Sequence, residues 1–580
     1  MSSRGILFLL LLSFSSGICL AESPENFLAE KNVAVPMRDG VILRADVTRP
    51  KSGARFPVLV YRTPYGKDST QKSQTTFKRA VERGYAVVVE DVRGRYHSDG
   101  EFRAYENEGH DGYDTIEWAA RQPWSDGKVG TFGLSYPGAV QWLAAVENPP
   151  HLKAMVPAMT FSTPQNFFYA WGTWDLSWTR WIWGNIAPDV RVKKNLAGPK
   201  TYREADQSWT QKSTKMLSVV PLNQLEELRD VAPYYYDWLR HPPEDPWWDW
   251  AELRNKYDRV HAAVLNFSAW YDDNYGPEGA TTNFAGLLKS RSGAKDRATS
   301  LVLGPWVHGG QQETKSGERE FSKGATIDYD ELILAWMDHY LRGIDNGVEK
   351  ASAVRYFVMG NNEWRDAESW PPPGELTPYY LTVSNDSARR LATDKPQSDD
   401  QEASFVSDPA NPVKNIYSSS GAHDYGDLSA RDDVLTFDSR PLDSDTEVTG
   451  FIQAKIFVSC ECRDADLWVR LLDVAPDGTA FNLMSPGLDV QRLSYREPEH
   501  GRQLLQPGEI HEIKLDHLMT SNVFLKGHKI RLQISGSFFP NFSRNPQNGD
   551  LETTSSVLQK AKISVYTDRR HPSQVLLPVR

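Results

Sequence analysis

Short apolar runs alternate with stretches of helical periodicity in two parts of the chain. Continuous apolar runs, typical of strands buried on both faces, occur at 57–61, 86–89, 129–132, 154–158, 262–267, 300–303 and 354–359. Between them, apolar positions recur at helical spacing over 77–83, 111–121 and 329–342. Strands that alternate with helices predict an α/β fold around a parallel sheet, and alternating residues over 32–48 predict a β-hairpin before it.

Two regions depart from this rhythm. Segment 161–260 is rich in aromatic residues, and five of its tryptophans recur at intervals of three, four, three and two: Trp171, Trp174, Trp178, Trp181 and Trp183. That spacing predicts a helical insertion capping the sheet. Beyond the proline run at 371–373, short strands between turn residues, such as 450–458, 467–474 and 529–535, predict a β-sandwich or jelly roll.

These patterns divide the 580 residues into parts. We expect a signal peptide (1–21), an α/β domain in two parts (22–160 and 261–370), a helical cap (161–260) and a jelly-roll β domain (371–580). The signal peptide is expected from Arg4, the apolar stretch 6–14 and small residues ending at Ala21. The apolar stretch is shorter than the roughly 20 residues that a membrane span needs, so we expect an exported protein, periplasmic or secreted, with no span.

Composition limits the kinds of partner and cofactor that the chain is expected to bind. The net charge of −11, with no offsetting basic run, argues against a nucleic-acid partner. After the leader only Cys460 and Cys462 remain. In an extended strand they would lie about 6.5 Å apart, near the upper limit for a disulfide, so we expect two free thiols. The sequence implies no metal and no cofactor, and it leaves the oligomeric state open.

The central motif is a serine at the end of a predicted strand. The apolar run 129–132 leads into Gly133-Leu134-Ser135-Tyr136-Pro137-Gly138 and then into a segment that can be helical. A strand that turns sharply into a helix exposes a serine hydroxyl and directs the next amide, here that of Tyr136, toward a developing oxyanion. The second glycine stands one position later than in the usual G-x-S-x-G pattern. Ser135 is therefore the candidate nucleophile.

A serine nucleophile needs a base and a carboxylate that orients the base. Downstream of Ser135, His308 is the histidine that directly follows a predicted buried strand, whereas His339 lies on a helix face. Between Ser135 and His308 in the chain, Asp272 and Asp273 follow another predicted strand. Only one of these two adjacent residues can face the imidazole. Four tryptophans are candidates to line an aromatic acyl pocket: Trp171, Trp174, Trp270 and Trp306.

Six motifs, in order, make the chain after its leader resemble the CocE/NonD hydrolases, the group of cocaine esterase, α-amino acid ester hydrolases and Xaa-Pro dipeptidyl-peptidases. The motifs are RTPYGK (62–67), DVRG (91–94), DGYDTIEW (111–118), GLSYPG (133–138), WYD (270–272) and GPWVH (304–308). The resemblance implies an α/β-hydrolase domain with a helical cap and a C-terminal jelly roll. It further implies Ser135 as nucleophile, Asp272 as acid, His308 as base, and an oxyanion hole of the Tyr136 amide and the Tyr65 phenol.

Three functions stay open at this point. The first is an exported serine hydrolase that cleaves small esters or activated amides. The second is an Xaa-Pro-type dipeptidyl-peptidase, which needs an acidic residue for the substrate amine, with Asp175 and Asp237 as candidates. At the positions where α-amino acid ester hydrolases carry Glu-Asp, this chain has the neutral Asn274 and Tyr275, so strict recognition of an α-amino group is not favoured unless Asp273 or the cap supplies a charge. The third is a secreted glycan-binding protein without activity.

Overall fold

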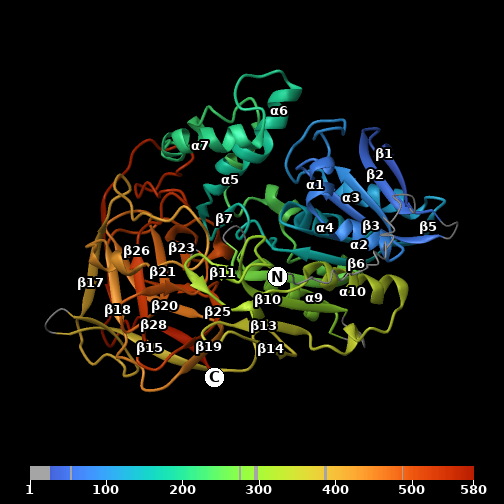
Figure 1. Ribbon diagram of the computed structural model, residues 1–580. Coiled ribbons are helices and arrows are strands. Elements are labelled where there is room, and N and C mark those ends of the chain that lie inside the picture. The colour runs from blue at the N-terminus through green and yellow to red at the C-terminus, as the bar shows by residue number, and fades with distance from the viewer. Residues whose placement is uncertain (1–26, 52–54, 273–275, 293–297, 385–387, 486) are drawn as a thin grey trace, which may run out of the picture.

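The structure is a computed structural model that describes residues 27–51, 55–272, 276–292, 298–384, 388–485 and 487–580. Two β-rich bodies lie side by side, and a group of helices stands above them (Figure 1). Within the described residues no helix has the length and apolar character that crossing a membrane requires.

The first body is a ten-stranded sheet in the order β1-β2-β4-β3-β5-β6-β9-β10-β13-β14. Its strands are β1 (Phe27–Pro36), β2 (Ile42–Pro50), β3 (Phe56–Thr63), β4 (Ala86–Asp91), β5 (Ser125–Leu134), β6 (Leu152–Ala158), β9 (Ala263–Tyr271), β10 (Thr299–Val307), β13 (Val354–Val358) and β14 (Glu363–Ala367). The strands from β4 to β13 are parallel, and β1, β2 and β14 are antiparallel additions at the edges. The predicted hairpin and parallel sheet are confirmed.

Helices cover both faces of this sheet. Alternate residues of β3 point to opposite sides, so that Val58 and Val60 join one apolar core and Leu59 and Tyr61 another. Helices α3 (Glu108–Ala120) and α4 (Tyr136–Ala145) pack on the first side, and α2 (Thr76–Glu82) and α10 (Tyr329–Arg342) on the second. Two further helices, α1 (Lys67–Ser73) and α9 (Glu278–Ser290), follow β3 and β9. The helices expected at 77–83, 111–121 and 329–342 are therefore present.

The aromatic segment is only partly the helix that its tryptophan spacing predicts. Besides short 3-10 turns, it contains α5 (Ser177–Trp181), a π-helical turn (Ile182–Ile186), α6 (Ala187–Lys193), α7 (Tyr202–Leu217) and α8 (Pro233–Arg240). The helical expectation is wrong for Trp171 and Trp174, which belong to a tight hairpin of β7 (Tyr169–Ala170) and β8 (Thr173–Trp174). Gly172 turns this hairpin at φ 98°, and the backbone of Trp174 bonds to Ser543 of the second body, so tertiary pairing overrides the local rhythm.

The second body is a fourteen-stranded β arrangement. Its strands are β15 (Glu375–Val383), β16 (Arg389–Ala392), β17 (Glu402–Ser407), β18 (Val434–Asp438), β19 (Thr446–Phe451), β20 (Gln453–Cys460), β21 (Asp466–Val474), β22 (Ala480–Asn482), β23 (Leu488–Arg492), β24 (His511–Leu515), β25 (Met519–Phe524), β26 (Lys529–Ser535), β27 (Ala561–Tyr566) and β28 (Gln574–Val579). The single strand expected at 450–458 is divided at Ile452, because β19 pairs with β25 whereas β20 pairs with β24 and β27.

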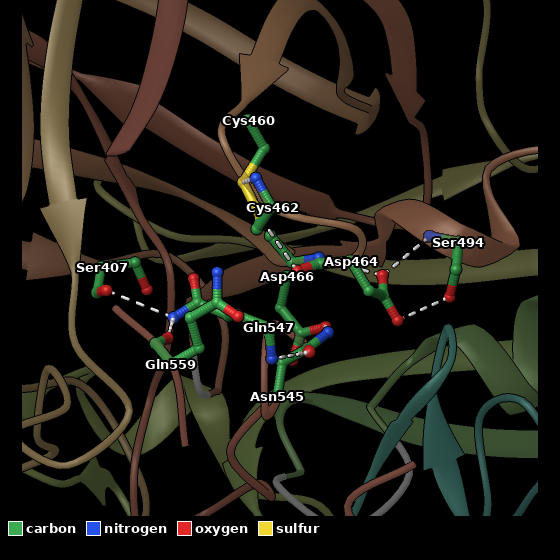
Figure 2. The surroundings of a disulfide bond; sticks show 10 residues. Ser407, Cys460, Cys462, Asp464, Asp466, Ser494, Asn545, Gln547 and Gln559 are labelled. Atoms are coloured by element: carbon green, nitrogen blue, oxygen red, sulfur yellow. Dashed lines mark hydrogen bonds between the residues drawn. A yellow bond between two sulfur atoms is a disulfide. The ribbon is translucent and has the colours of Figure 1, made fainter. Parts of the chain in front are cut away.

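Cys460 and Cys462 form a disulfide, so the expectation of two free thiols is wrong (Figure 2). The two Cα atoms lie 5.1 Å apart, closer than in an extended strand, because β20 ends at Cys460 and the chain bends after it. Both cysteines are buried. Next to them the carboxylate of Asp464 accepts hydrogen bonds from the backbone N–H and the hydroxyl of Ser494.

Candidate active site

A cavity of about 460 Å³ lies where strands of the parallel sheet end and the aromatic segment covers them. Three residues expected from the sequence to take part in catalysis share its wall: Ser135 directly after β5, His308 directly after β10, and Tyr65 after β3. Ligands of open α/β sheets bind beyond the carboxyl ends of the strands, which is where this cavity is. The full lining is Tyr61, Tyr65, Gln74, Leu134, Ser135, Asp175, Ser177, Trp178, Arg180, Trp181, Asn185 and His308.

Ser135 occupies the sharp corner between β5 and α4. Its φ of 69° and ψ of −126° lie in a region that side-chain-bearing residues rarely adopt. Its N–H donates to the carbonyl of Ala158 at 3.0 Å, and its carbonyl accepts from the N–H groups of Gly138 and Ala139. These bonds hold the strained corner, which leaves the hydroxyl facing the cavity and the Tyr136 amide in the first turn of α4.

The two glycines around the serine are required by close packing. A Cβ on Gly133 would lie 2.5 Å from the Cβ of Pro137, at a φ of 145°. A Cβ on Gly138 would lie 2.6 Å from the carbonyl oxygen of Ala158. Helix α4 therefore packs against the end of β6 at Gly138 with no room for a side chain, which explains why a glycine stands at this position.

His308 and Asp272 are directly paired. The imidazole Nδ1 lies 2.8 Å from Oδ1 of Asp272. Asp272 is fully buried, whereas about a quarter of the His308 side chain is exposed, 23%. A proton on Nδ1 that is donated to the carboxylate leaves Nε2 as the basic nitrogen of the ring. Asp273, Asn274 and Tyr275 lie outside the described residues.

Tyr65 and Tyr136 use different groups toward the cavity. The Tyr65 phenol is at the cavity wall, where its oxygen accepts a hydrogen bond from the indole N–H of Trp181 at 3.1 Å. Burial raises the pKa of Tyr65, and hydrogen bonds with Trp181 and Ser135 partly oppose the shift. The Tyr136 side chain points into the core and donates to Glu108 Oε1 at 2.7 Å, so only its backbone is near the serine.

Buried ion pairs lie next to the turn between β5 and α4 that carries Ser135. Arg62 lies 2.7 Å from Glu90 and 2.8 Å from Glu108, and all three side chains are buried. Burial raises the pKa of Glu90 to about 7, against the opposing effect of the Arg62 charge. Glu108 also accepts a hydrogen bond from the Tyr136 phenol, and Thr115 donates to Glu90, so residues of the motifs at 62–67 and 111–118 belong to a network that reaches the start of α4.

The four tryptophans proposed from the sequence lie outside the cavity wall. Trp171 stacks on His517 at a ring distance of 3.5 Å, and Trp174 is buried against Tyr169 and Tyr235. The indole N–H groups of Trp270 and Trp306 donate to backbone carbonyls in the core. Trp178 and Trp181, which share one face of α5 at a spacing of three, line the cavity instead. Their spacing in the sequence could not distinguish them, because Trp171 and Trp174 belong to the same run of intervals.

The fold and the site together define the class of protein: a serine hydrolase with an α/β-hydrolase core followed by a β domain. Residues 39–310 match the model of the X-Pro dipeptidyl-peptidase (S15) family, and residues 346–576 match that of the X-Pro dipeptidyl-peptidase C-terminal non-catalytic domain. The chain is 33% identical to the cocaine esterase of Rhodococcus sp. (strain MB1 Bresler), over 96% of this chain and 99% of the relative. The chain belongs to the CocE/NonD hydrolases.

Solved structures agree on the fold. An α-amino acid ester hydrolase matches with a TM-score of 0.78 at 22% identity, covering 98% of this chain and 100% of that structure. An aminopeptidase from a marine sediment archaeon, Thaumarchaeota archaeon, also matches with a TM-score of 0.78 at 22% identity, covering 97% and 99%. At this level of identity the two structures support the architecture alone.

Proposed function

We propose that this protein is an exported serine hydrolase that cleaves carboxylic esters or activated amides through an acyl-enzyme intermediate. One observation supports this most strongly: Ser135, His308 and Tyr65 share the wall of one cavity, and His308 is paired with the buried carboxylate of Asp272. In this proposal 161–260 is a helical cap over the α/β core of 22–160 and 261–370, and 371–580 is a jelly-roll domain.

The residues have distinct roles in the proposed reaction. His308 Nε2 accepts the proton of the Ser135 hydroxyl as its oxygen attacks the carbonyl carbon, and Asp272 stabilises the imidazolium that forms. The Tyr136 amide and the Tyr65 phenol donate to the oxyanion of the tetrahedral intermediate. His308 then protonates the leaving alcohol or amine, and water releases the acyl group by the same steps.

The cavity favours a small, largely apolar acyl group. Trp178, Trp181 and Leu134 supply an apolar wall next to the serine. The cocaine esterase relative is named for the hydrolysis of an ester, which supports esters over peptides as first candidates.

The test compares two hydroxyls of the same cavity. Ser135→Ala should abolish turnover of p-nitrophenyl butyrate and labelling by phenylmethylsulfonyl fluoride, whereas Ser177→Ala, which removes another lining hydroxyl, should retain both. Activity that survives Ser135→Ala would refute the proposal, and a protein that neither turns over esters nor reacts with any serine probe would favour the glycan-binding alternative.

A second candidate function is an Xaa-Pro-type dipeptidyl-peptidase, and the observation that favours it is Asp175. This buried carboxylate lines the cavity and is a countercharge for a substrate ammonium group. Asp237, the other candidate from the sequence, does not line the cavity and is paired with Arg103 at 2.6 Å. Faster hydrolysis of Ala-Pro-p-nitroanilide than of its N-acetylated form, lost in Asp175→Asn, would establish this function.

Export is tested separately, because residues 1–21 lie outside the described residues. The full chain expressed in a bacterial host should yield a mature protein that begins after Ala21 in the periplasmic or extracellular fraction. N-terminal sequencing of that fraction decides the point, since an intact leader in the cytoplasmic fraction would contradict export.

A further inference from the structure

The indole of Trp181 makes a hydrogen bond whose direction is fixed by chemistry. Its Nε1–H lies 3.1 Å from the phenol oxygen of Tyr65. An indole N–H can only donate, so the phenol oxygen is the acceptor in this bond. A phenol has one hydrogen to donate, and with an acceptor position occupied by Trp181 that hydrogen must be directed to another partner.

We propose that Trp181 is a positioning residue for Tyr65: it holds the phenol so that the O–H points toward the carbonyl oxygen of the bound substrate. The proposal rests on the proposed function, in which Tyr65 stabilises the oxyanion. Ser135 and Tyr65 line the same cavity and are hydrogen-bonding partners, so the phenol is directed toward the nucleophile at which the reacting carbonyl binds.

Arg95 fixes the two partners relative to each other. Its fully buried guanidinium donates to the carbonyl of Pro64, the residue before Tyr65, at 2.8 Å. The same group donates to the carbonyls of Asn185 and Ile186 at 3.0 and 2.9 Å, in the π-helical turn that follows Trp181. The planar guanidinium of Arg95 therefore connects the loop of Tyr65 to the helix of Trp181. This connection fixes the distance between the Tyr65 phenol and the Trp181 indole.

Trp181 also contacts the residue that supplies the second oxyanion donor. Its ring stacks on that of Tyr136 at 5.9 Å with an interplanar angle of 12°. Trp181 thus touches both residues assigned to the oxyanion hole, one by its N–H and one by its ring face.

Trp178 is the matched comparison. It lines the same cavity from the same helix, but its indole N–H donates to the backbone carbonyl of Phe167 at 2.9 Å. A tryptophan that only forms the apolar wall would behave like Trp178. Replacement of each by phenylalanine removes the N–H and keeps an aromatic ring.

The experiment is a double-mutant cycle with Trp181→Phe, Trp178→Phe and Tyr65→Phe in the full-length protein, with p-nitrophenyl butyrate as substrate. We expect Trp181→Phe to lower kcat about three- to tenfold with KM within about twofold, the size of effect of one neutral hydrogen bond. Tyr65→Phe should cost more, about 10²- to 10³-fold. In the Tyr65→Phe background the further effect of Trp181→Phe should fall below about twofold, because the bond has no acceptor there.

A second readout separates positioning from packing. The inhibition constant of phenylboronic acid, whose adduct with serine resembles the tetrahedral intermediate, should rise in Trp181→Phe by the same factor as kcat falls. Trp178→Phe should change kcat by the same factor in the wild-type and Tyr65→Phe backgrounds. If Trp181→Phe fails to fold by circular dichroism, Trp181→Met, whose flexible side chain adapts to the space, is measured in the same cycle.

The outcomes distinguish the two proposals. Equal effects of the Trp181 change in both backgrounds, or no loss of kcat, would overturn the positioning role while Ser135→Ala still abolishes turnover. Full activity of Tyr65→Phe would overturn the positioning role together with the oxyanion role of Tyr65. Activity in Ser135→Ala would overturn the serine-hydrolase proposal itself.

Discussion

Gly138→Ala tests whether the packing of α4 on β6 positions the nucleophile. The added Cβ would lie 2.6 Å from the carbonyl oxygen of Ala158 and 3.2 Å from that of Gly133. A shift of about 0.8 Å is needed to relax the first contact to 3.4 Å. The same Ala158 carbonyl accepts the N–H of Ser135, so the shift is transmitted directly to the nucleophile.

The expected losses of stability and of activity differ in size. Overpacking lowers the free energy of unfolding by about 1–3 kcal/mol, and exchanging glycine for alanine inside a helix raises it by about 1 kcal/mol. The net change of about 0–2 kcal/mol should lower the unfolding temperature by only a few degrees. A displacement approaching 1 Å at the reacting oxygen can lower kcat by about 10²-fold, so we expect a loss of at least tenfold.

The assay is kcat for p-nitrophenyl butyrate together with the thermal midpoint from differential scanning calorimetry. Gly324→Ala is the control, because its added Cβ would meet no atom closer than Ser322 Oγ at 3.6 Å, and it should leave both quantities nearly unchanged. A Gly138→Ala protein with full kcat would refute the reasoning. A fall in kcat that only follows loss of folded protein would refute it equally.

Three further predictions follow from other contacts. Asp272→Asn should lower kcat by roughly 10³- to 10⁴-fold at pH 7, because the imidazole loses the carboxylate that orients it; an equal loss in Asp99→Asn, an exposed acid, would contradict this. At His517 burial opposes protonation, but the carboxylates of Asp489, Glu278 and Asp516 outweigh it and raise the pKa. The stabilisation that protonated His517 gains from these carboxylates should therefore be complete below pH ~6.5 and be lost as the pH rises through the folded pKa. Melting of His517→Asn and wild type from pH 6 to 9 should show a shrinking difference, and a constant difference would count against it. Reduction of the Cys460–Cys462 disulfide should lower the free energy of unfolding by only about 1–2 kcal/mol, because the disulfide closes a very short loop. Urea unfolding with and without reductant measures this difference. Two thiols titrating in unreduced, denatured protein would show that the bond does not form.

The elements of the α/β core could be predicted from local pattern alone. Buried parallel strands read as continuous apolar runs, and the helix predicted at 329–342 is α10 (Tyr329–Arg342). The pattern failed where partners distant in sequence decide the local structure. Trp174 pairs its backbone with Ser543, and Cys462 lies beyond a bend that ends β20, so neither follows the extended or helical geometry that its spacing indicated.

The sequence by itself determined the candidate catalytic residues: a serine at a glycine-flanked corner, and a histidine and an aspartate at the ends of later strands. These are local features, because a sharp turn needs glycine and a buried strand needs a continuous apolar run. Only the tertiary structure decided which aromatic residues meet that chemistry. Which tryptophans line the cavity depends on how the aromatic segment packs on the sheet. This packing places Trp178 and Trp181 at the cavity, whereas Trp174, Trp270 and Trp306 are buried elsewhere. Packing between distant segments leaves no periodicity in the chain, so the pairing of Trp181 with Tyr65 was visible only in three dimensions.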